Sequence, residues 1–117
     1  MEEKIFANEN HKNYYENLMK CINKKYHESE KIKSLIYLLA LFETIKPGFA
    51  KIVFNFKKMA IKPEVLSEPW QTSSTRRTIR LAFNLFDDYP VLLSEIFGYS
   101  YWDEYYLEAI RIRFPHC

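Results

Sequence analysis

The polar and hydrophobic positions at the start of the chain follow a helical period. Lysines and glutamates lie between hydrophobic residues that recur every fourth position: Tyr14, Leu18, Ile22 and Tyr26. A single hydrophobic stripe is typical of a helix that covers a core with one face. We therefore predict a surface helix that begins at a capping asparagine, Asn8 or Asn10, and runs to about Lys25.

The next hydrophobic run has no polar side. It reads LIYLLALF over residues 35–42. A helix that is hydrophobic all round is normally surrounded by other elements. We predict a central helix that begins near Glu30, is capped by Ser29 and runs to Ile45, where a Lys-Pro-Gly sequence ends it.

Residues 49–57 allow two interpretations. A third helix is predicted by the helical spacing of the hydrophobic residues Phe49, Ile52, Val53 and Phe56. The string KIVFNF also alternates as a strand does, so a strand stays open as the second interpretation. Residues 57–71 contain two prolines and are predicted to be irregular, apart from a single turn opened by Pro63.

The second half of the chain predicts three more helices. They span residues 74–86, residues 90–97 and a last segment opened by a capping box in which Ser100 pairs with Asp103. The spacing of hydrophobic residues predicts that the last helix buries a stripe made of Trp102, Tyr106, Ala109, Ile110 and Phe114.

Composition supports an all-α fold. Only two glycines occur among 117 residues, which leaves few positions for the turns of a β-sandwich or barrel. The length fits one domain. We therefore predict a compact single-domain bundle of five or six helices over residues 1–117, in which residues 35–42 cross residues 79–86 at the centre.

The cellular location is predicted from the length of the hydrophobic runs, the spacing of the cysteines and the polarity of the N-terminus. The run at 35–42 is far shorter than the ~20 apolar residues that span a bilayer. Cys21 and Cys117 have no paired spacing, which is usual for a reduced intracellular protein. The N-terminus also lacks the hydrophobic region of a signal peptide. We expect a cytoplasmic protein with no membrane partner.

A tryptophan, four successive hydroxyl residues and two arginines precede the 74–86 helix. Free N–H groups of a first turn, hydroxyls and guanidiniums bind phosphate or carboxylate groups, and an indole stacks on a base. A helical wheel places four polar residues of this region in one sector: Ser73, Arg77, Arg80 and Asn84. The candidate ligand-binding residues are Trp70, Gln71, Thr72, Ser73, Ser74, Thr75, Arg76, Arg77, Arg80 and Asn84. The alternative, with more precedents, is that the hydroxyls cap the helix and Trp70 fills a gap in the core.

Tyrosines are concentrated near the C-terminus, and aromatic residues make up 17% of the chain. Several of them lie off the predicted buried stripe and beside acidic residues. Exposed aromatic rings are enriched at protein interfaces, so this end would suit a basic protein partner unless the irregular segment covers it. The candidate partner-binding residues here and in a lysine-rich segment are Tyr99, Tyr101, Asp103, Glu104, Tyr105, Lys57, Lys58 and Lys62.

The charge is divided unevenly along the chain. Residues 1–62 carry twelve lysines against seven glutamates, a net +5, and residues 63–117 carry five arginines against eight acidic residues, a net −3. Such a division allows one face to attract an acidic partner, although a solvated lysine surface is the more common explanation. Direct nucleic-acid binding is disfavoured but stays open, because the lysine-rich string KKMAIKPE lacks the interleaved aromatic residues of a single-strand-binding groove.

No catalytic or metal-binding motif occurs in the sequence. The three histidines have no metal-ligand spacing, no glycine-rich phosphate loop is present, and no base can be assigned to Cys21. We therefore expect no enzymatic activity, no cofactor and no metal.

Several strings resemble an uncharacterised family of short proteins from Gram-positive bacteria and their phages or mobile elements: IKPEVL, WQTSSTRR, LAFNLF, YP and EAIRIRF. The resemblance implies no established activity, but its mobile-element setting suggests a role in conflict between host and phage. We expect a non-enzymatic binding protein that inhibits a host defence or nucleic-acid-handling machine by occupying a protein surface. The alternative is a nucleotide or phosphate-ligand binding protein, a sensor or a sponge, that uses the Trp70 to Arg77 segment.

Overall fold

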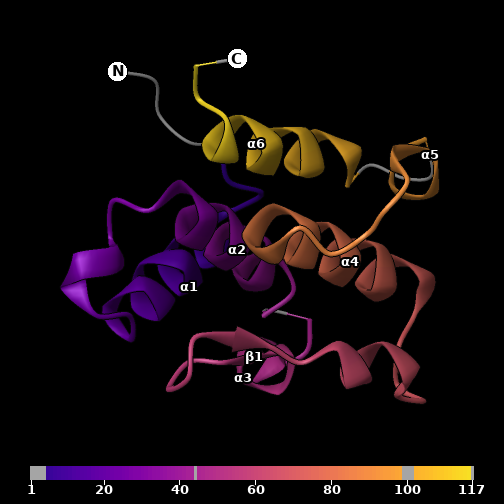
Figure 1. The fold of residues 1–117 in the computed structure, drawn as a ribbon, viewed down its shortest axis with the longest axis horizontal. Coiled ribbons are helices and arrows are strands. Elements are labelled where there is room, and N and C mark those ends of the chain that lie inside the picture. The colour runs from indigo at the N-terminus through magenta and orange to yellow at the C-terminus, as the bar shows by residue number, and fades with distance from the viewer. Residues whose placement is uncertain (1–4, 44, 99–101, 117) are drawn as a thin grey trace.

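Helix α2, Glu30–Leu41, is the central element of the molecule. The computed structural model describes residues 5–43, 45–98 and 102–116. Within it α2 packs against α1, α3, α4 and α6 (Figure 1), and the side chains from Leu35 to Leu41 are all 0–3% exposed. The predicted central helix and its packing against the 79–86 segment are therefore confirmed.

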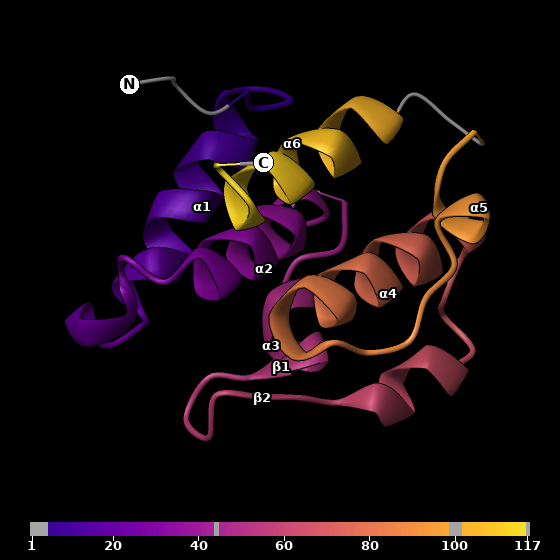
Figure 2. The same ribbon diagram turned by 45° about the horizontal axis from the view of Figure 1, so that its top comes forward.

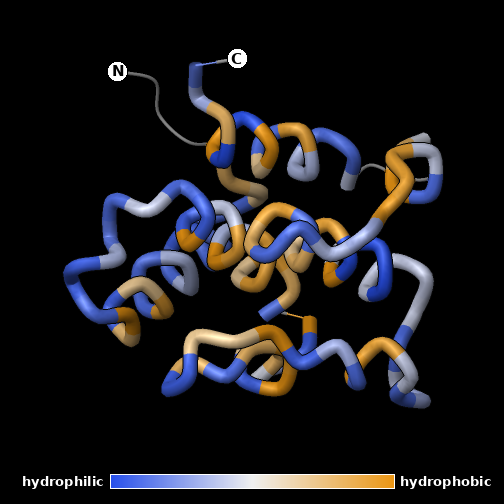
Figure 3. Tube along the Cα trace, viewed as in Figure 1, coloured by the Kyte–Doolittle hydropathy of each residue, from blue (hydrophilic) through white to orange (hydrophobic). Residues whose placement is uncertain are grey.

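The other elements follow the chain around this helix, as Figure 2 shows from a second direction. The described elements, in chain order, are α1 (Glu9–Lys20), a 3₁₀ turn η1 (Lys24–Tyr26), α2, α3 (Phe49–Val53), β1 (Phe54–Asn55), β2 (Ala60–Ile61), a 3₁₀ turn η2 (Pro63–Ser67), α4 (Ser73–Asp87), α5 (Leu93–Ile96) and α6 (Asp103–Arg113). The predicted all-α class holds, with one small antiparallel hairpin added. Hydrophobic segments meet at the centre, where α2 and α4 pack together (Figure 3).

Helix α1 begins where the sequence predicts and ends earlier. The side-chain oxygen of Asn8 accepts the backbone N–H of His11 at 2.8 Å, which confirms the asparagine cap. The helix ends at Lys20 instead of Lys25. The side chain of Asn23 accepts the backbone N–H of Lys25 at 3.0 Å, so a local turn replaces the last part of the predicted helix.

The end of α2 is set by a contact with the next element. Ser29 caps the helix as predicted, but the helix ends at Leu41 and not at Ile45. The Glu43 carboxylate accepts the backbone N–H groups of Gly48 (2.7 Å) and Ala50 (3.0 Å) at the start of α3. These bonds turn the chain into α3, which is why the helical pattern stops early.

Both interpretations of residues 49–57 describe part of this segment. The predicted helix forms over Phe49–Val53, but its extension to Phe56 is wrong. Phe54–Asn55 instead pairs with Ala60–Ile61 as two strands, with Phe54 opposite Ile61. The backbone N–H of Lys62 donates to the Val53 carbonyl at 3.2 Å and extends the ladder, so pairing with a distant segment decides where the helix ends.

The later helices are close to the predicted ones but shorter at two places. Pro63 opens the predicted turn, and α4 includes one residue more at each end than the predicted 74–86. Helix α5 is a single turn, against the predicted 90–97, and α6 begins at Asp103, three residues later than predicted. The carboxylate of Asp103 accepts the backbone N–H of Gly98 at 2.7 Å. Ser100 lies outside the described residues.

The predicted buried stripe of the last helix is wrong at its C-terminal end. Tyr106 and Ala109 are fully buried, whereas Ile110 is half-buried and Phe114 is 41% exposed. The Nε of Arg113 donates to the Leu85 carbonyl at 2.8 Å and joins the end of α6 to that of α4. This contact holds the helix by its inner side, so the residues on the opposite side remain uncovered.

A buried polar cluster fastens the N-terminal segment to α1, α2 and α6. The hydroxyl of Tyr37 donates to the Ile5 carbonyl, and the Ile5 N–H donates to the Glu108 carboxylate at 3.0 Å. His11, only 1% exposed, accepts the Ala7 N–H at Nδ1 (3.0 Å) and donates from Nε2 to the Tyr37 carbonyl (2.9 Å). Since Nδ1 accepts a hydrogen bond, the buried imidazole is neutral.

No helix among the described residues has the length and the hydrophobicity to cross a membrane.

The neutral state of His11 predicts a pH-dependent stability. Burial lowers the pKa of His11, partly opposed by its hydrogen bond to Tyr37. Below the unfolded-state pKa of about 6.5, the unfolded chain therefore binds more protons than the folded chain. We expect the free energy of unfolding to be greatest above pH 6.5 and to fall between pH 6.5 and 5, with a slope of at most about 1.4 kcal/mol per pH unit.

Urea denaturation followed by circular dichroism at several pH values would measure this dependence. The variant His11→Asn should lose the slope in this pH range, and the exposed residue in His116→Asn serves as the matched control that keeps it. Equal slopes in wild type and His11→Asn would contradict the assignment.

Candidate functional site

The segment from Trp70 to Arg77 joins η2 to the first turns of α4. Trp70 is half-buried, and its ring meets Phe49 edge to face with a centroid distance of 6.1 Å. The ammonium of Lys46 lies 4.6 Å from the centroid of the Trp70 ring. One side of the indole thus fills a gap beside α3, and a lysine already makes a cation–π contact with the ring.

The hydroxyl residues of this segment cap α4. Thr72 accepts the backbone N–H of Thr75 at 3.1 Å, and Thr75 Oγ1 accepts the backbone N–H of Thr72 at 2.8 Å. Buried Gln71 accepts the Thr75 hydroxyl and donates to the Val65 carbonyl at 2.9 Å. These reciprocal bonds satisfy N–H groups that a phosphate would otherwise bind.

Ser74 and Arg77 lie beside the buried phenol of α6. The Arg77 guanidinium donates to Ser74 Oγ at 3.3 Å. The Thr78 hydroxyl donates to the Ser74 carbonyl at 2.9 Å and lies 2.6 Å from the Tyr106 hydroxyl. Burial raises the pKa of Tyr106, against the opposing effects of the Thr78 hydrogen bond and the positive charge of Arg77. Arg77 therefore contributes to the contact between α4 and α6.

The remaining residues of the predicted polar stripe do not converge. Arg80 pairs with Glu95 at 3.3 Å on the surface, and the Asn84 amide donates to the Tyr89 carbonyl at 3.0 Å. Arg76 donates weakly to the Leu66 carbonyl at 3.4 Å, and Ser73 is exposed. A phosphate at this segment would have to replace bonds that the folded chain already makes, with Ser73 and the exposed Arg76 as its most accessible contacts.

The predicted partner-binding residues divide into three groups. Tyr99 and Tyr101 lie outside the described residues. Tyr105 is half-buried, and its ring lies between those of His11 and Trp102. The Asp103 carboxylate accepts a hydrogen bond from the Gly98 N–H, and Glu104 is exposed. Lys57 and Lys58 are exposed in the β1–β2 turn. The Lys62 ammonium donates to the Lys51 carbonyl at 3.2 Å.

The outer face of α6 is a feature that the sequence interpretation missed. Leu107 is 59% exposed, Phe114 is 41% exposed, and half-buried Ile110 lies between them. Together with Arg111 they line a shallow hollow of about 460 Å³. The spacing of positions 107, 110 and 114 is helical, so the signal was present, but Ile110 and Phe114 were assigned to the buried stripe and Leu107 was not considered.

The two acidic residues beside this face differ, because one is buried in an ion pair and the other is exposed. Glu108 is 3% exposed and pairs with Arg111, whose Nε and Nη2 both approach the carboxylate at 2.9 Å. The bidentate pair and the Ile5 N–H keep this buried carboxylate compensated. Glu104, one turn before Glu108, is exposed.

Within residues 5–43, 45–98 and 102–116, no three side chains of histidine, cysteine, aspartate or glutamate lie together as metal ligands would. The buried histidine holds two backbone groups and is therefore engaged in structure.

A family model covers residues 1–117 in full, and it describes a family of unknown function, DUF6075. The chain therefore belongs to that family, in agreement with the expected uncharacterised family. No curated protein and no solved structure matches the chain.

The capping role of Thr72 predicts a stability effect that is specific to this residue. Because Thr72 is exposed and caps α4 through its hydroxyl, Thr72→Ala should lower the free energy of unfolding by about 1 kcal/mol. Ser73→Ala, at the neighbouring exposed hydroxyl, should change it by less than about 0.5 kcal/mol. Urea denaturation of the two variants checks this, and an equal loss in both would contradict the assigned cap.

Proposed function

For this member of a family without a known function, we propose a role as a non-enzymatic binding protein that inhibits a larger protein by occupying one of its surfaces. The outer face of α6, made of Leu107, Ile110 and Phe114, is the surface that binds. The observation that supports this role is the exposure of two large hydrophobic side chains, 59% for Leu107 in α6 and 41% for Phe114 directly after it, which line the same hollow.

The position of α6 in the fold supports the proposal. The helix forms an outer layer, and no other helix or strand of the described chain lies over its far side (Figure 1). Its inner side is held by buried Tyr106 and Ala109. A contiguous exposed hydrophobic stripe on a rigid helix is a common feature of protein interaction sites.

The shape and charge of the face favour an amphipathic helix as the partner element. Hydrophobic residues at positions 107, 110 and 114 form a stripe that a second helix can cover with residues of the same spacing. Glu104 is an exposed acidic residue one turn before the stripe, whereas Arg111 is paired with Glu108 and the Arg113 guanidinium lies 4.5 Å from the centroid of the Phe114 ring. A basic residue on the partner would complement Glu104, in keeping with the basic partner expected from the acidic C-terminal half.

The class of partner rests on the family resemblance. Similarity to short proteins of phages and mobile elements suggests that the blocked protein is a host defence or nucleic-acid-handling component. The inhibition itself needs no catalytic group, since occupying a surface suffices to exclude another molecule.

A nucleotide or phosphate ligand at Trp70 to Arg77 is the alternative function. Exposed Ser73 and the weakly bonded guanidinium of Arg76 favour it, although the other hydroxyls serve as caps.

The main proposal predicts the effect of a charge on the α6 face. Leu107→Asp should leave the fold intact, because the side chain is exposed, and should weaken partner binding at least tenfold, or about 1.4 kcal/mol. Leu92→Asp, at a residue that is 65% exposed next to α5, is the matched control that should bind as wild type. The captured partner would be purified and its dissociation constant measured with all three proteins.

Two outcomes would count against the α6 face. One is the absence of any stoichiometric partner from a host lysate. The other is a purified partner that binds wild type and Leu107→Asp equally well.

The alternative function predicts a different measurement. We expect the melting temperature of the protein to stay unchanged with ATP or with inorganic phosphate, because the capping bonds occupy the segment. A saturable rise in melting temperature that Arg76→Ala abolishes would favour the alternative.

A further inference from the structure

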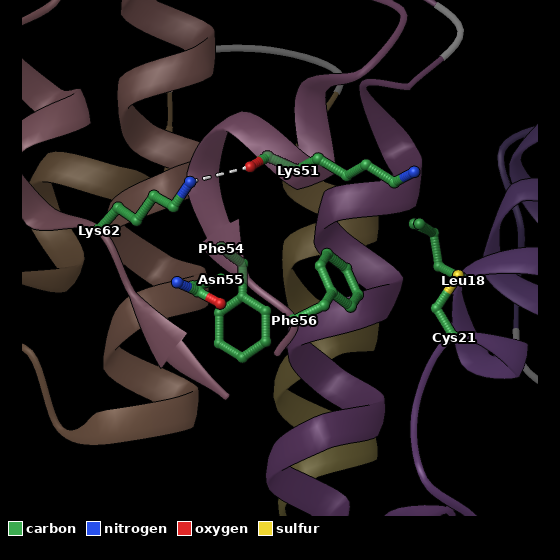
Figure 4. Close-up of a pocket in the computed structure, with 7 residues that line it drawn as sticks. All are labelled: Leu18, Cys21, Lys51, Phe54, Asn55, Phe56 and Lys62. Atoms are coloured by element: carbon green, nitrogen blue, oxygen red, sulfur yellow. Dashed lines mark hydrogen bonds between the residues drawn. The ribbon is translucent and has the colours of Figure 1, made fainter. Parts of the chain in front are cut away.

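A pocket opens between the C-terminal end of α1 and the junction of α3 with β1. Its volume is about 290 Å³. Figure 4 shows the rings of Phe54 and Phe56 at its centre, with Leu18 and Cys21 on the α1 side. The pocket is distant in sequence from α6, and none of its lining residues belongs to the face proposed above.

The floor of the pocket is apolar. Phe54 is almost completely buried, and the rings of Phe54 and Phe56 meet edge to face with a centroid distance of 5.2 Å. Leu18 closes the opposite wall. The packed rings give the floor a fixed shape, and Phe56, which is half-buried, supplies the apolar surface that a ligand can still cover.

The rim of the pocket is positively charged. Lys51 and Lys62 both line it, and none of the lining residues is acidic. The Lys62 ammonium donates one hydrogen bond to the Lys51 carbonyl at 3.2 Å, and two of its three N–H donors are left for a ligand. The Lys51 side chain extends toward Leu18, so its charge lies at the α1 side of the pocket (Figure 4).

From this combination we propose that the pocket binds a small carboxylate with an apolar body. The apolar body would cover the half-buried ring of Phe56, and the carboxylate would accept a hydrogen bond from Lys51, with Lys62 adding positive charge on the other side of the pocket. A volume near the lower end of the roughly 300–1,000 Å³ range of ligand pockets selects a small molecule. A predominantly apolar lining with a few charged groups at the rim selects an amphipathic one.

Cys21 makes the proposal measurable because its exposed side chain lines the pocket. The chain has two cysteines, so the full-length Cys117→Ser protein carries Cys21 as its single thiol. Alkylation of this thiol by neutral iodoacetamide, followed by intact mass, reports whether the pocket is occupied. Octanoate supplies both the body and the charge, octanol supplies the body alone, and acetate supplies the charge alone.

Octanoate should slow the alkylation of Cys21 in a saturable way, at a concentration at least tenfold lower than octanol, and acetate should have no effect. In the same background, Lys51→Met should raise the apparent dissociation constant of octanoate about tenfold, because a charge-assisted hydrogen bond is lost. Lys57→Met, at an exposed lysine of the β1–β2 turn that does not line the pocket, is the matched control and should leave it unchanged.

Three results would overturn the proposal. They are no saturable protection by octanoate, equal protection by octanol and octanoate, and equal affinity of octanoate for Lys51→Met and the Lys57→Met control. None of them bears on the α6 face, which is tested with a protein partner.

Discussion

The requirement to cover α2 on every side organises the rest of the structure. Burying a large hydrophobic side chain stabilises a protein by about 1.5–3 kcal/mol, and the run from Leu35 to Leu41 contains no exposed position. One neighbouring helix cannot cover a cylinder, so α1, α3, α4 and α6 each contribute a hydrophobic side. The surrounding elements can then be amphipathic and short, because each has to cover only one sector of α2.

The same helix also brings a polar group into the core. Tyr37 lies within the buried run, and its hydroxyl needs a partner there because an unbonded buried hydroxyl is costly. The Ile5 carbonyl supplies that partner, and the Ile5 N–H is satisfied in turn by Glu108 of α6. A single buried hydroxyl thus explains why the N-terminal segment is ordered against α2 and why α6 carries a buried, compensated carboxylate.

Features that depend on neighbouring residues could be predicted from the sequence, and those that depend on distant contacts could not. The caps at Asn8 and Ser29 and the all-round hydrophobicity of α2 are local properties. The ends of helices depend on contacts such as Glu43 with α3, which no periodicity reveals. For the candidate site, Phe114 shows where prediction from the sequence fails. Two neighbouring hydrophobic stripes at the C-terminal helix look alike in sequence, although only one is buried. At Trp70 to Arg77 the residue types located a polar cluster, but caps and anion sites use the same groups.

Binding free energy is available where hydrophobic surface is exposed, and less where polar groups already make hydrogen bonds within the protein. A ligand at Thr72 or Gln71 would exchange one hydrogen bond for another, and such exchanges contribute about 1 kcal/mol or less. Covering exposed hydrophobic surface contributes about 25 cal/mol for each Å² removed from water, which favours the α6 face, where Leu107 is 59% exposed, over the capped segment. Helix α6 and the α3–β1 region lie at opposite ends of the molecule in Figure 1, with α2 and α4 between them. Occupancy of one proposed site would therefore not exclude occupancy of the other on steric grounds.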